Sequence, residues 1–386
     1  RIGMSSCQHW ETGHYAAHDH LADADLDLFV FLGDYIYENG AKEDLQFVSP
    51  TGVTRRHPPT QAVDLETYRI RYGLYRTDPQ LQRHHAAHPW IITWDDPEVD
   101  NNYAGRFTTT SASMERFLRR REAAYQVWYE PRPVRVDPPE DPSGEWPIHH
   151  DLRWGDLAHL WLLDGRQYRD DQPEDGDRLP ITGIDDPDLG LLTFGPTALD
   201  PTHRMLGEDQ ERWLVDGVTS TSARWKVMAQ QVFMHGLTLV PGTTPVTITD
   251  TWDGYHANRQ AILEAIAAAG VDDLIVLTGD FHTFSVGDLR TDPYDRSLPI
   301  IGAEFMTGAI SSHVPEWREA VAPLVEAFNP QIKLFETRNG YGICEFTREQ
   351  CSVDLMVLID VQDPDSSSAL LARFVVDSGI PGARRV

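Results

Sequence analysis

The chain has 386 residues, with 33 Lys and Arg against 60 Asp and Glu, and a formal net charge of −27 at pH 7. Hydrophobic residues make up 41% of the chain, which predicts a sizeable core and excludes an intrinsically disordered protein. The longest apolar runs, such as 28–32 and 274–277, are far shorter than the roughly 20 residues of a membrane-spanning helix. The acidic charge argues against nucleic acid as the main partner and suits a protein that binds cations.

Short apolar segments alternate with amphipathic ones along the chain, which predicts an α/β fold. In chain order we expect a strand at 2–4, a strand at 28–33, a helix at 67–75, a strand at 90–94, a helix at 114–128, strands at 156–163 and 225–233, a helix at 259–269, a strand at 273–278 and a hairpin over 340–360. Segments 131–147 and 172–195, rich in Pro, Gly or Asp, are expected to be surface loops. The pattern predicts one large domain without repeats.

Three cysteines, Cys7, Cys344 and Cys351, are too few for a fold held together by disulfides. Cys344 and Cys351 flank the turn of the expected hairpin, so a disulfide across it is open, although the spacing favours two free thiols. The chain starts with neither an initiator Met nor a signal-peptide pattern, so the sequence does not indicate a location directly.

Acidic residues follow three of the predicted strands at the point where each strand ends. Asp34, Asp96 and Asp280 each come just after a strand, and His282 lies two residues beyond Asp280. Ligands gather at the carboxyl ends of strands in open α/β sheets. We therefore expect the three carboxylates to lie side by side and to need a divalent or trivalent cation that neutralises them.

Each of these residues also has a simpler interpretation. A single Asp after a strand is more often a turn former or a helix cap, so only the three ends together favour a metal site. Tyr37 and Cys7 would add a phenolate and a thiolate, but taken alone each is more often a core residue.

Several longer motifs point to a known family. They are the segments 5–8, 26–38, 94–102, 164–172, 205–210, 252–255 and 279–282. In their content and order they resemble the PhoD-like alkaline phosphatase and phosphodiesterase family. The resemblance implies a calcineurin-like metallophosphoesterase fold, an α/β (α+β) four-layer αββα sandwich of two mixed sheets flanked by helices. It also implies one catalytic domain over residues 1–386, without the small β-sandwich domain that often precedes it in the family.

The resemblance further implies a centre that holds a ferric ion (Fe3+) and calcium ions (Ca2+). The metal ligands implied in this sequence are Cys7, Asp34, Tyr37, Asn101, Asp280 and His282. Cys7, Asp34 and Tyr37 would hold the iron, and Asp34 would bridge to calcium. Asn101 would supply an oxygen on the calcium side.

The residues expected to act on the substrate are Asp34, Asp96, Arg121 and His282. Asp96 stands where broader relatives carry a metal-binding Asn. Arg121 belongs to the run 119–121, and an arginine of this run could hold phosphate oxygens with its guanidinium fork. The alternative is that the run is a solvated face of a helix.

Pro97 departs from the family pattern, which has a His at this position. In the wider superfamily that His is the acid that helps the leaving alkoxide depart, and Pro has no proton to give. Because general acid catalysis contributes a factor of about 100 to 10,000, we expect weak activity on esters with poor leaving groups.

Three functions therefore stay open. The first is a metal-dependent phosphoester hydrolase, with a slight preference for diesters over monoesters. The second is a phosphate- or phospholipid-binding protein on a decayed phosphatase fold, and the third is a hydrolase of a different ester whose leaving group needs no protonation. The expected partner is a small phosphoester or phospholipid, and the resemblance implies a secreted, periplasmic or cell-surface protein.

Other classes of enzyme are less compatible with the sequence. It has no Gly-x-Ser-x-Gly nucleophile elbow and no phosphate-binding P-loop, so a serine hydrolase of that type and a nucleotide-driven motor are set aside. The paired histidines at 84–85 and 149–150 are expected on the surface or in loops rather than as metal ligands.

Overall fold

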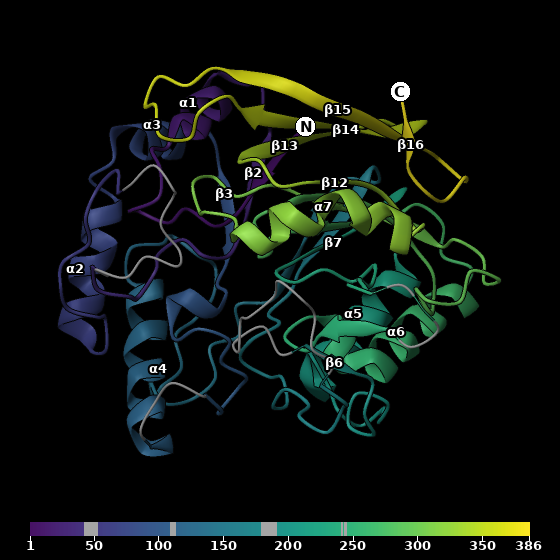
Figure 1. The fold of residues 1–386 in the computed structure, drawn as a ribbon, viewed down its shortest axis with the longest axis horizontal. Helices are drawn as coiled ribbons and strands as arrows, with labels where there is room; N and C mark the ends of the chain where they lie inside the picture. Colours follow the sequence, from purple (N-terminus) through teal and green to yellow (C-terminus); the bar gives the residue numbers. More distant parts are fainter. Residues whose placement is uncertain (42–52, 109–112, 179–190, 241, 243–244) are drawn as a thin grey trace.

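Two seven-stranded mixed sheets form the centre of the molecule in the computed structural model, which describes residues 1–41, 53–108, 113–178, 191–240, 242 and 245–386 (Figure 1). The first sheet has the order β16-β15-β14-β13-β1-β2-β3. Its strands are β1 (Ile2–Ser5), β2 (Leu28–Leu32), β3 (Trp90–Thr93), β13 (Gly340–Phe346), β14 (Gln350–Leu358), β15 (Ser368–Asp377) and β16 (Arg384–Arg385). Because β1, β2 and β3 pair in parallel, their carboxyl ends meet at one edge.

The second sheet has the order β12-β10-β11-β9-β7-β5-β4. Its strands are β4 (His150–Trp154), β5 (Ala158–Leu162), β7 (Trp225–Gln230), β9 (Leu274–Thr278), β10 (Phe284–Leu289), β11 (Gly302–Met306) and β12 (Ile332–Glu336). The pairs β5–β7, β7–β9 and β9–β11 are parallel. A separate two-stranded sheet joins β6 (Leu191–Thr193) to β8 (Val246–Ile248).

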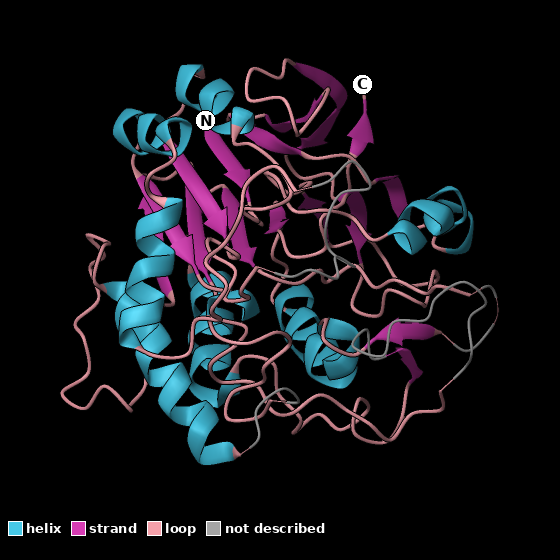
Figure 2. Cartoon of the chain, turned by 60° about the vertical axis from the view of Figure 1, so that its left-hand side comes forward, coloured by secondary structure: helices cyan, strands magenta, loops and turns pink. Residues whose placement is uncertain are grey.

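Helices cover the outer face of each sheet (Figures 1 and 2). The helices are α1 (Ala16–Asp23), α2 (Leu65–Tyr75), α3 (Pro79–Ala87), α4 (Met114–Tyr129), α5 (Gly207–Ser220), α6 (His256–Ala268) and α7 (Glu316–Phe328), with two short 3₁₀ helices, η1 (Asp96–Glu98) and η3 (Trp252–Tyr255). Side chains from α1 to α4 share one core with β2 and β3, and side chains from α5 and α6 share another with β7 and β9. The four-layer αββα architecture is thereby confirmed.

The sequence of β2 explains how one strand packs into two hydrophobic cores. Phe29 and Phe31 pack into the core beneath the helices, whereas Leu28, Val30 and Leu32 pack into the core between the two sheets. Successive side chains of a strand point to opposite faces, so a strand that is buried on both faces must be apolar throughout. This is the continuous apolar run that the sequence displays.

The expected elements all occur, and their bounds differ by a few residues. The helix expected at 67–75 starts at Leu65, because Asp64 caps it and forms a reciprocal capping box with Thr67. Most of the expected loop 172–195 is irregular where it is described, although β6 lies in it, and residues 179–190 lie outside the described residues.

The structure confirms the expectation for two cysteines and corrects the one for a histidine. Cys344 and Cys351 are free buried thiols, as the spacing favoured, and the alternative of a disulfide across the hairpin is wrong. His84 is fully buried on α3, so its expected place on the surface is wrong. No helix in the described ranges is long and apolar enough to cross a membrane.

Burial leaves His84 in a hydrogen-bonded pair with His18, whose Nδ1 lies 2.9 Å from the Nδ1 of His84. The Nε2 of His18 lies 2.8 Å from Oε1 of Gln8. Burial lowers the pKa of His18 well below its usual value and the pKa of His84 to about 2. Both imidazoles are therefore neutral in the folded chain.

This pair predicts a loss of stability in mild acid. The unfolded chain takes up protons on these imidazoles below about pH 6.5 while the folded chain does not, so the free energy of unfolding falls as the pH drops through that value. The His84 contribution is about 2 kcal/mol at pH 5. We expect His84→Asn to flatten the dependence between pH 7.5 and pH 5, as measured by urea unfolding. A variant that loses as much stability as the unsubstituted protein over this interval would contradict the prediction.

Candidate active site

The two sheets approach each other where β1, β2 and β9 end, and glycines make this approach possible. A Cβ atom added to Gly279 would lie 2.6 Å from Oγ of Ser6, on the other sheet. One added to Gly33 would lie 2.5 Å from Cβ of Asp95. Because these distances are far below van der Waals contact, the glycines that precede Asp34 and Asp280 let the strand ends converge.

The residues at these ends have a backbone conformation that side chains usually avoid. Cys7, Asp34, Asn102, Asp280 and His282 have positive φ angles of 59°, 60°, 53°, 63° and 55°. Among the described residues, Asp273 is the one other non-glycine residue with a positive φ. Each such conformation costs on the order of 1 kcal/mol or more and tends to occur at functional sites, where the surrounding structure enforces it. The strain therefore marks the same edge as the sequence motifs.

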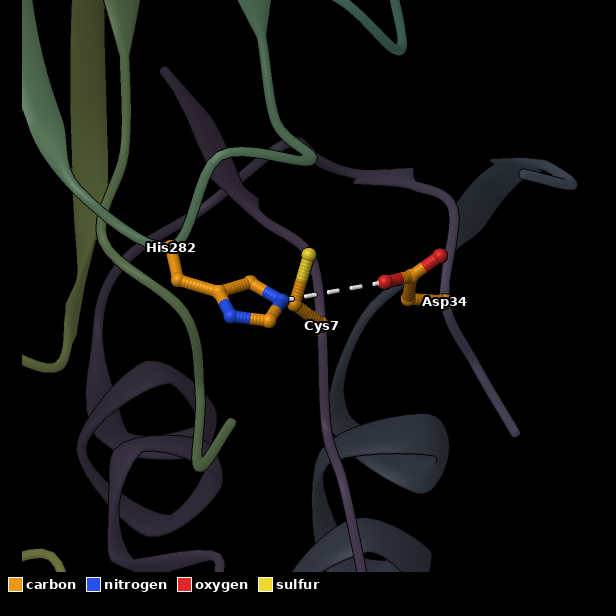
Figure 3. Close-up of side chains that lie close together, drawn as sticks. All are labelled: Cys7, Asp34 and His282. Atoms are coloured by element: carbon orange, nitrogen blue, oxygen red, sulfur yellow. Dashed lines mark ion pairs between the residues drawn. The ribbon is translucent and has the colours of Figure 1, made fainter. Parts of the chain in front are cut away.

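Cys7, Asp34 and His282 form a compact group at this edge (Figure 3). One ligand atom from each lies within 4.8 Å of the others, and the His282 ring points toward the Asp34 carboxylate at 3.9 Å. The Tyr37 hydroxyl lies 2.7 Å from Oδ2 of Asp34 and 3.1 Å from Nε2 of His282. The structure thus brings together a thiol, a carboxyl, an imidazole and a phenol.

The hydrogen bonds of this group leave ligand atoms available. His282 Nδ1 lies 2.8 Å from the backbone carbonyl of His313, which can only accept, so Nδ1 carries the hydrogen and Nε2 keeps a lone pair beside the Tyr37 hydroxyl, whose hydrogen goes to Asp34. Oδ1 of Asp34 is buried and has no hydrogen-bond partner among the described residues. A buried acceptor without a partner is costly, and a bound cation would satisfy it.

Asp34 also belongs to a second group with Asp95 and Asp96, whose ligand atoms lie within 4.8 Å of one another. Burial raises the pKa of Asp96 to about 8 and that of Asp280 to about 7, and burial followed by the charge of Asp96 raises the pKa of Asp34 well above its usual range. Carboxylates at this density do not all ionise on their own, and a cation between them would lower their pKa values. The residues present therefore fit a site for more than one metal ion.

The Cys7 thiol and the Tyr37 phenol also fit a site for a metal ion. Burial, followed by the charge of Asp34, raises the pKa of both Cys7 and Tyr37 well above the ordinary values. Neither group would ionise without a strongly polarising cation beside it. A thiolate and a phenolate are donors that suit a transition metal, whereas the carboxylates of Asp96 and Asp280 suit a hard divalent cation.

Arg166 is the residue of this region that sequence reasoning missed as a participant. Its buried guanidinium forms a bidentate ion pair with Asp250 at 2.8 Å for both bonds and a hydrogen bond to Asp95. It lies 3.3 Å from Asp96 and 3.8 Å from Asp280. Arg166 belongs to the 164–172 motif, which could have indicated a role at the site. Only the structure shows that it contacts acids from three other loops.

Glu98 ties two of the loops together. Its carboxylate accepts hydrogen bonds from the backbone N–H groups of Asp34 at 3.0 Å, Tyr35 at 2.6 Å and Asp95 at 2.9 Å. Pro97 precedes it in the first turn of η1, where a backbone N–H is not needed. Pro97 therefore suits the local backbone, whatever its effect on the chemistry.

Two further predicted site residues lie on α4 and in the loop after η1. Arg121, on α4, donates a hydrogen bond to the carbonyl of Gly105 at 2.6 Å, and its guanidinium lies 5.5 Å from the Tyr125 ring centroid. Asn101 is half-buried in the loop after η1. The roles assigned to both stay predictions. Arg120, by contrast, is buried and ion-paired with Asp100 at 2.6 Å, so a fully solvated face for the run 119–121 is wrong.

Comparison with known proteins agrees with the motifs. A family model described as PhoD-like phosphatase matches residues 2–355. Alkaline phosphatase D of Bacillus subtilis (strain 168) is 36% identical over 389 residues, an alignment that covers 100% of this chain and 63% of that protein. A solved structure described as the structure of PhoD superposes with a TM-score of 0.90 at 34% identity and covers 100% of this chain and 71% of that chain. The chain thus spans less than two thirds of the curated relative.

The raised pKa values of the carboxyl groups predict how the metal-free protein depends on pH. An acid whose pKa is raised in the fold contributes stability that is lost as the pH rises through that pKa. Because the unfolded pKa of Asp is about 4 and the folded pKa values of Asp280 and Asp96 are about 7 and about 8, the metal-free protein should lose stability between about pH 4 and pH 8.

Metal removal should therefore destabilise the protein more at neutral pH than in mild acid. We expect the drop in Tm on treatment with a chelator to grow from about pH 5 to about pH 8, and to be reversed when metal is added back, as measured by calorimetry. A chelated protein whose Tm stays constant across this range would contradict the crowding of the carboxylates.

Proposed function

Because the chain belongs to the PhoD-like phosphatase family, we propose that it hydrolyses phosphate esters, with metal ions bound at the edge where β1, β2, β3 and β9 end. The observation that carries the proposal is that Asp34 belongs to both groups of potential ligands. One carboxylate shared by two groups is the arrangement expected of a bridge between two metal ions.

The donors on either side of Asp34 suggest which metals bind. Cys7, Tyr37 and His282 would hold the transition metal, for which we propose ferric iron. Asp96, Asp280 and Asn101 would complete the other side, for which we propose calcium. These assignments combine the donor chemistry of the described residues with the family resemblance.

Metals bound here would supply two things, the neutralisation of the phosphate charge and a water of lowered pKa that attacks phosphorus in line. The chain's own residues hold the geometry. The Nδ1–H of His282 is fixed on a carbonyl so that Nε2 faces Asp34, and Glu98 fixes the peptide of Asp34. Arg166 lies beside Asp96 and Asp280 and compensates part of their charge.

The leaving group sets the substrate preference that we propose. The position of Pro97 offers no proton, so esters whose alkoxide departs without help should react best. A diester carries one negative charge, which metals alone can neutralise, so we keep a slight preference for diesters. A phosphate- or phospholipid-binding protein is the alternative that Pro97 favours, and Arg121 stays a candidate for contact with phosphate oxygens.

Two further expectations rest on the resemblance. We propose that residues 1–386 act as one catalytic domain, which agrees with the shared core between the two sheets. A location outside the cytoplasm stays a prediction.

Substitution of the shared ligand tests the function. We expect Asp34→Asn to lower the hydrolysis of bis(p-nitrophenyl) phosphate by about 1,000-fold or more, because the bridging charge is lost, and to lower the metal content measured by elemental analysis. Asp273→Asn is the matched control, since Asp273 is also buried with a φ of 59° but lies just before β9, at the other end of the strand from Asp280. An Asp34→Asn protein that keeps both activity and metal would refute the site, and an unsubstituted protein that binds phosphate without turnover of any ester would favour the binding protein.

Restoring the missing acid tests the role of Pro97. Because Pro97 lies in the first turn of η1, a residue with a backbone N–H is compatible with the fold there. We expect Pro97→His to raise the rate for alkyl phosphate esters by about tenfold or more and to leave nitrophenyl esters nearly unchanged. The ratio of the two rates is the measurement, since structural damage would lower both alike. An unchanged ratio in a folded, metal-loaded variant would mean that another group already supplies the proton.

A further inference from the structure

A third group of metal-binding residue types lies beside the candidate active site. His9, Glu11 and His57 are all buried, and one ligand atom from each lies within 4.8 Å of the others. The ring of His9 packs edge-on against the ring of Tyr37, with 4.5 Å between centroids. Two imidazoles and a carboxylate have the composition of a zinc site, but their neighbours indicate a different role.

The hydrogen bonds of the Tyr75 hydroxyl distinguish a zinc site from a hydrogen-bonding role. The backbone N–H groups of Trp10 and Tyr37 lie 3.2 Å and 3.1 Å from it and can only donate. They occupy its two acceptor sites, so its own hydrogen is left for Nε2 of His57, at 3.0 Å. With Nε2 accepting, a neutral His57 carries its hydrogen on Nδ1.

The carboxylate of Glu11 lies near this nitrogen. Nδ1 of His57 is buried and lies 3.7 Å from Oε2 of Glu11, beyond hydrogen-bond distance, while Oε1 of Glu11 accepts the backbone N–H of His57 at 3.0 Å. A metal ion would need the lone pair that Nδ1 does not have in this state. The three side chains Glu11, His57 and Tyr75 thus lie in a buried carboxylate–imidazole–phenol chain, in which Glu11 holds the backbone of His57 and the His57 ring shares a hydrogen bond with Tyr75.

Tyr75, at the end of this series of side chains, accepts the backbone N–H of Tyr37. A second residue of α2 holds the same segment. Arg71 lies four residues before Tyr75, on the same face of the helix. Its guanidinium donates to the carbonyl of Tyr37 and, at 2.5 Å, to the carbonyl of Asn39. One helix therefore holds both the N–H and the C=O of Tyr37, while the phenol of Tyr37 reaches Asp34.

We propose that Tyr75 is a positioning residue for Tyr37, and that Glu11 and His57 keep the Tyr75 hydroxyl turned so that its oxygen accepts the peptide N–H of Tyr37. The proposal rests on the proposed function, since it gives Tyr37 a role at the metal centre. Tyr75 itself is fully buried and does not meet the substrate.

The test is a double-mutant cycle with Tyr75→Phe and Tyr37→Phe, read out by kcat, KM and metal content. Loss of an outer contact to a metal ligand typically costs about 10- to 100-fold in activity or metal affinity. We expect that loss for Tyr75→Phe alone, mainly in kcat, and almost no further loss when Tyr37 is already Phe. Tyr72→Phe is the matched control on the same helix, because its buried hydroxyl makes no hydrogen bond to the Tyr37 segment among the described residues, and it should leave all three quantities unchanged.

Each other outcome has a defined meaning. Equal losses for Tyr75→Phe in both backgrounds would show a merely structural role and overturn the proposal. If Tyr75→Phe does not fold, His57→Gln keeps the phenol and breaks the chain, and it should show the same dependence on Tyr37. A metal content that falls by one ion in His57→Gln while the Asp34 group stays loaded would overturn the proposal in favour of a third metal site. Full activity and metal content in Tyr37→Phe would refute the role of Tyr37 in the proposed function rather than the role of Tyr75.

Discussion

The organisation of this molecule depends on one electrostatic constraint, the crowding of buried carboxylates where the two sheets meet. Asp34, Asp95, Asp96 and Asp280 come from three strand ends and are all buried or nearly so. Taking several like charges out of water is costly unless each is paired. Within the described residues, the guanidinium of Arg166 is the protein's own compensation, and it does not match the number of acids around it. The deficit of positive charge is what makes the edge a place for cations.

The backbone is built to maintain this crowding. Strained left-handed conformations at Cys7, Asp34, Asp280 and His282 turn the side chains toward one another, and glycines at 33 and 279 remove the atoms that would keep the loops apart. Glu98 and α2 then fix the peptides of the same loops from outside. A set of costly local conformations is thus maintained by hydrogen bonds from side chains that are not proposed ligands themselves.

Much of this could be predicted from the sequence, for reasons that individual residues make clear. The apolar run of β2 and the Gly-Asp pairs after β2 and β9 identify buried strands and their functional ends, because period and turn chemistry are local properties. The family motifs identified the fold. The positions of Arg166 and Tyr75 could not be predicted, because a buried Arg in one loop and a buried Tyr in a helix acquire their partners only through long-range packing. The same is true of His84, whose neighbours in sequence suggested a surface pair.

One feature of the fold bears on how the protein is made. Strand β1, which leads directly to Cys7, is an interior strand that pairs with β2 on one side and with β13 on the other, where Ile2 is opposite Cys344. Contacts between residues this distant in sequence form slowly, since a long loop must close first. During synthesis the first strand emerges long before its partner at 340–346. The group of Cys7, Asp34 and His282 is likewise complete only after residue 282 has been made, so any cation that needs all three side chains would bind late in synthesis.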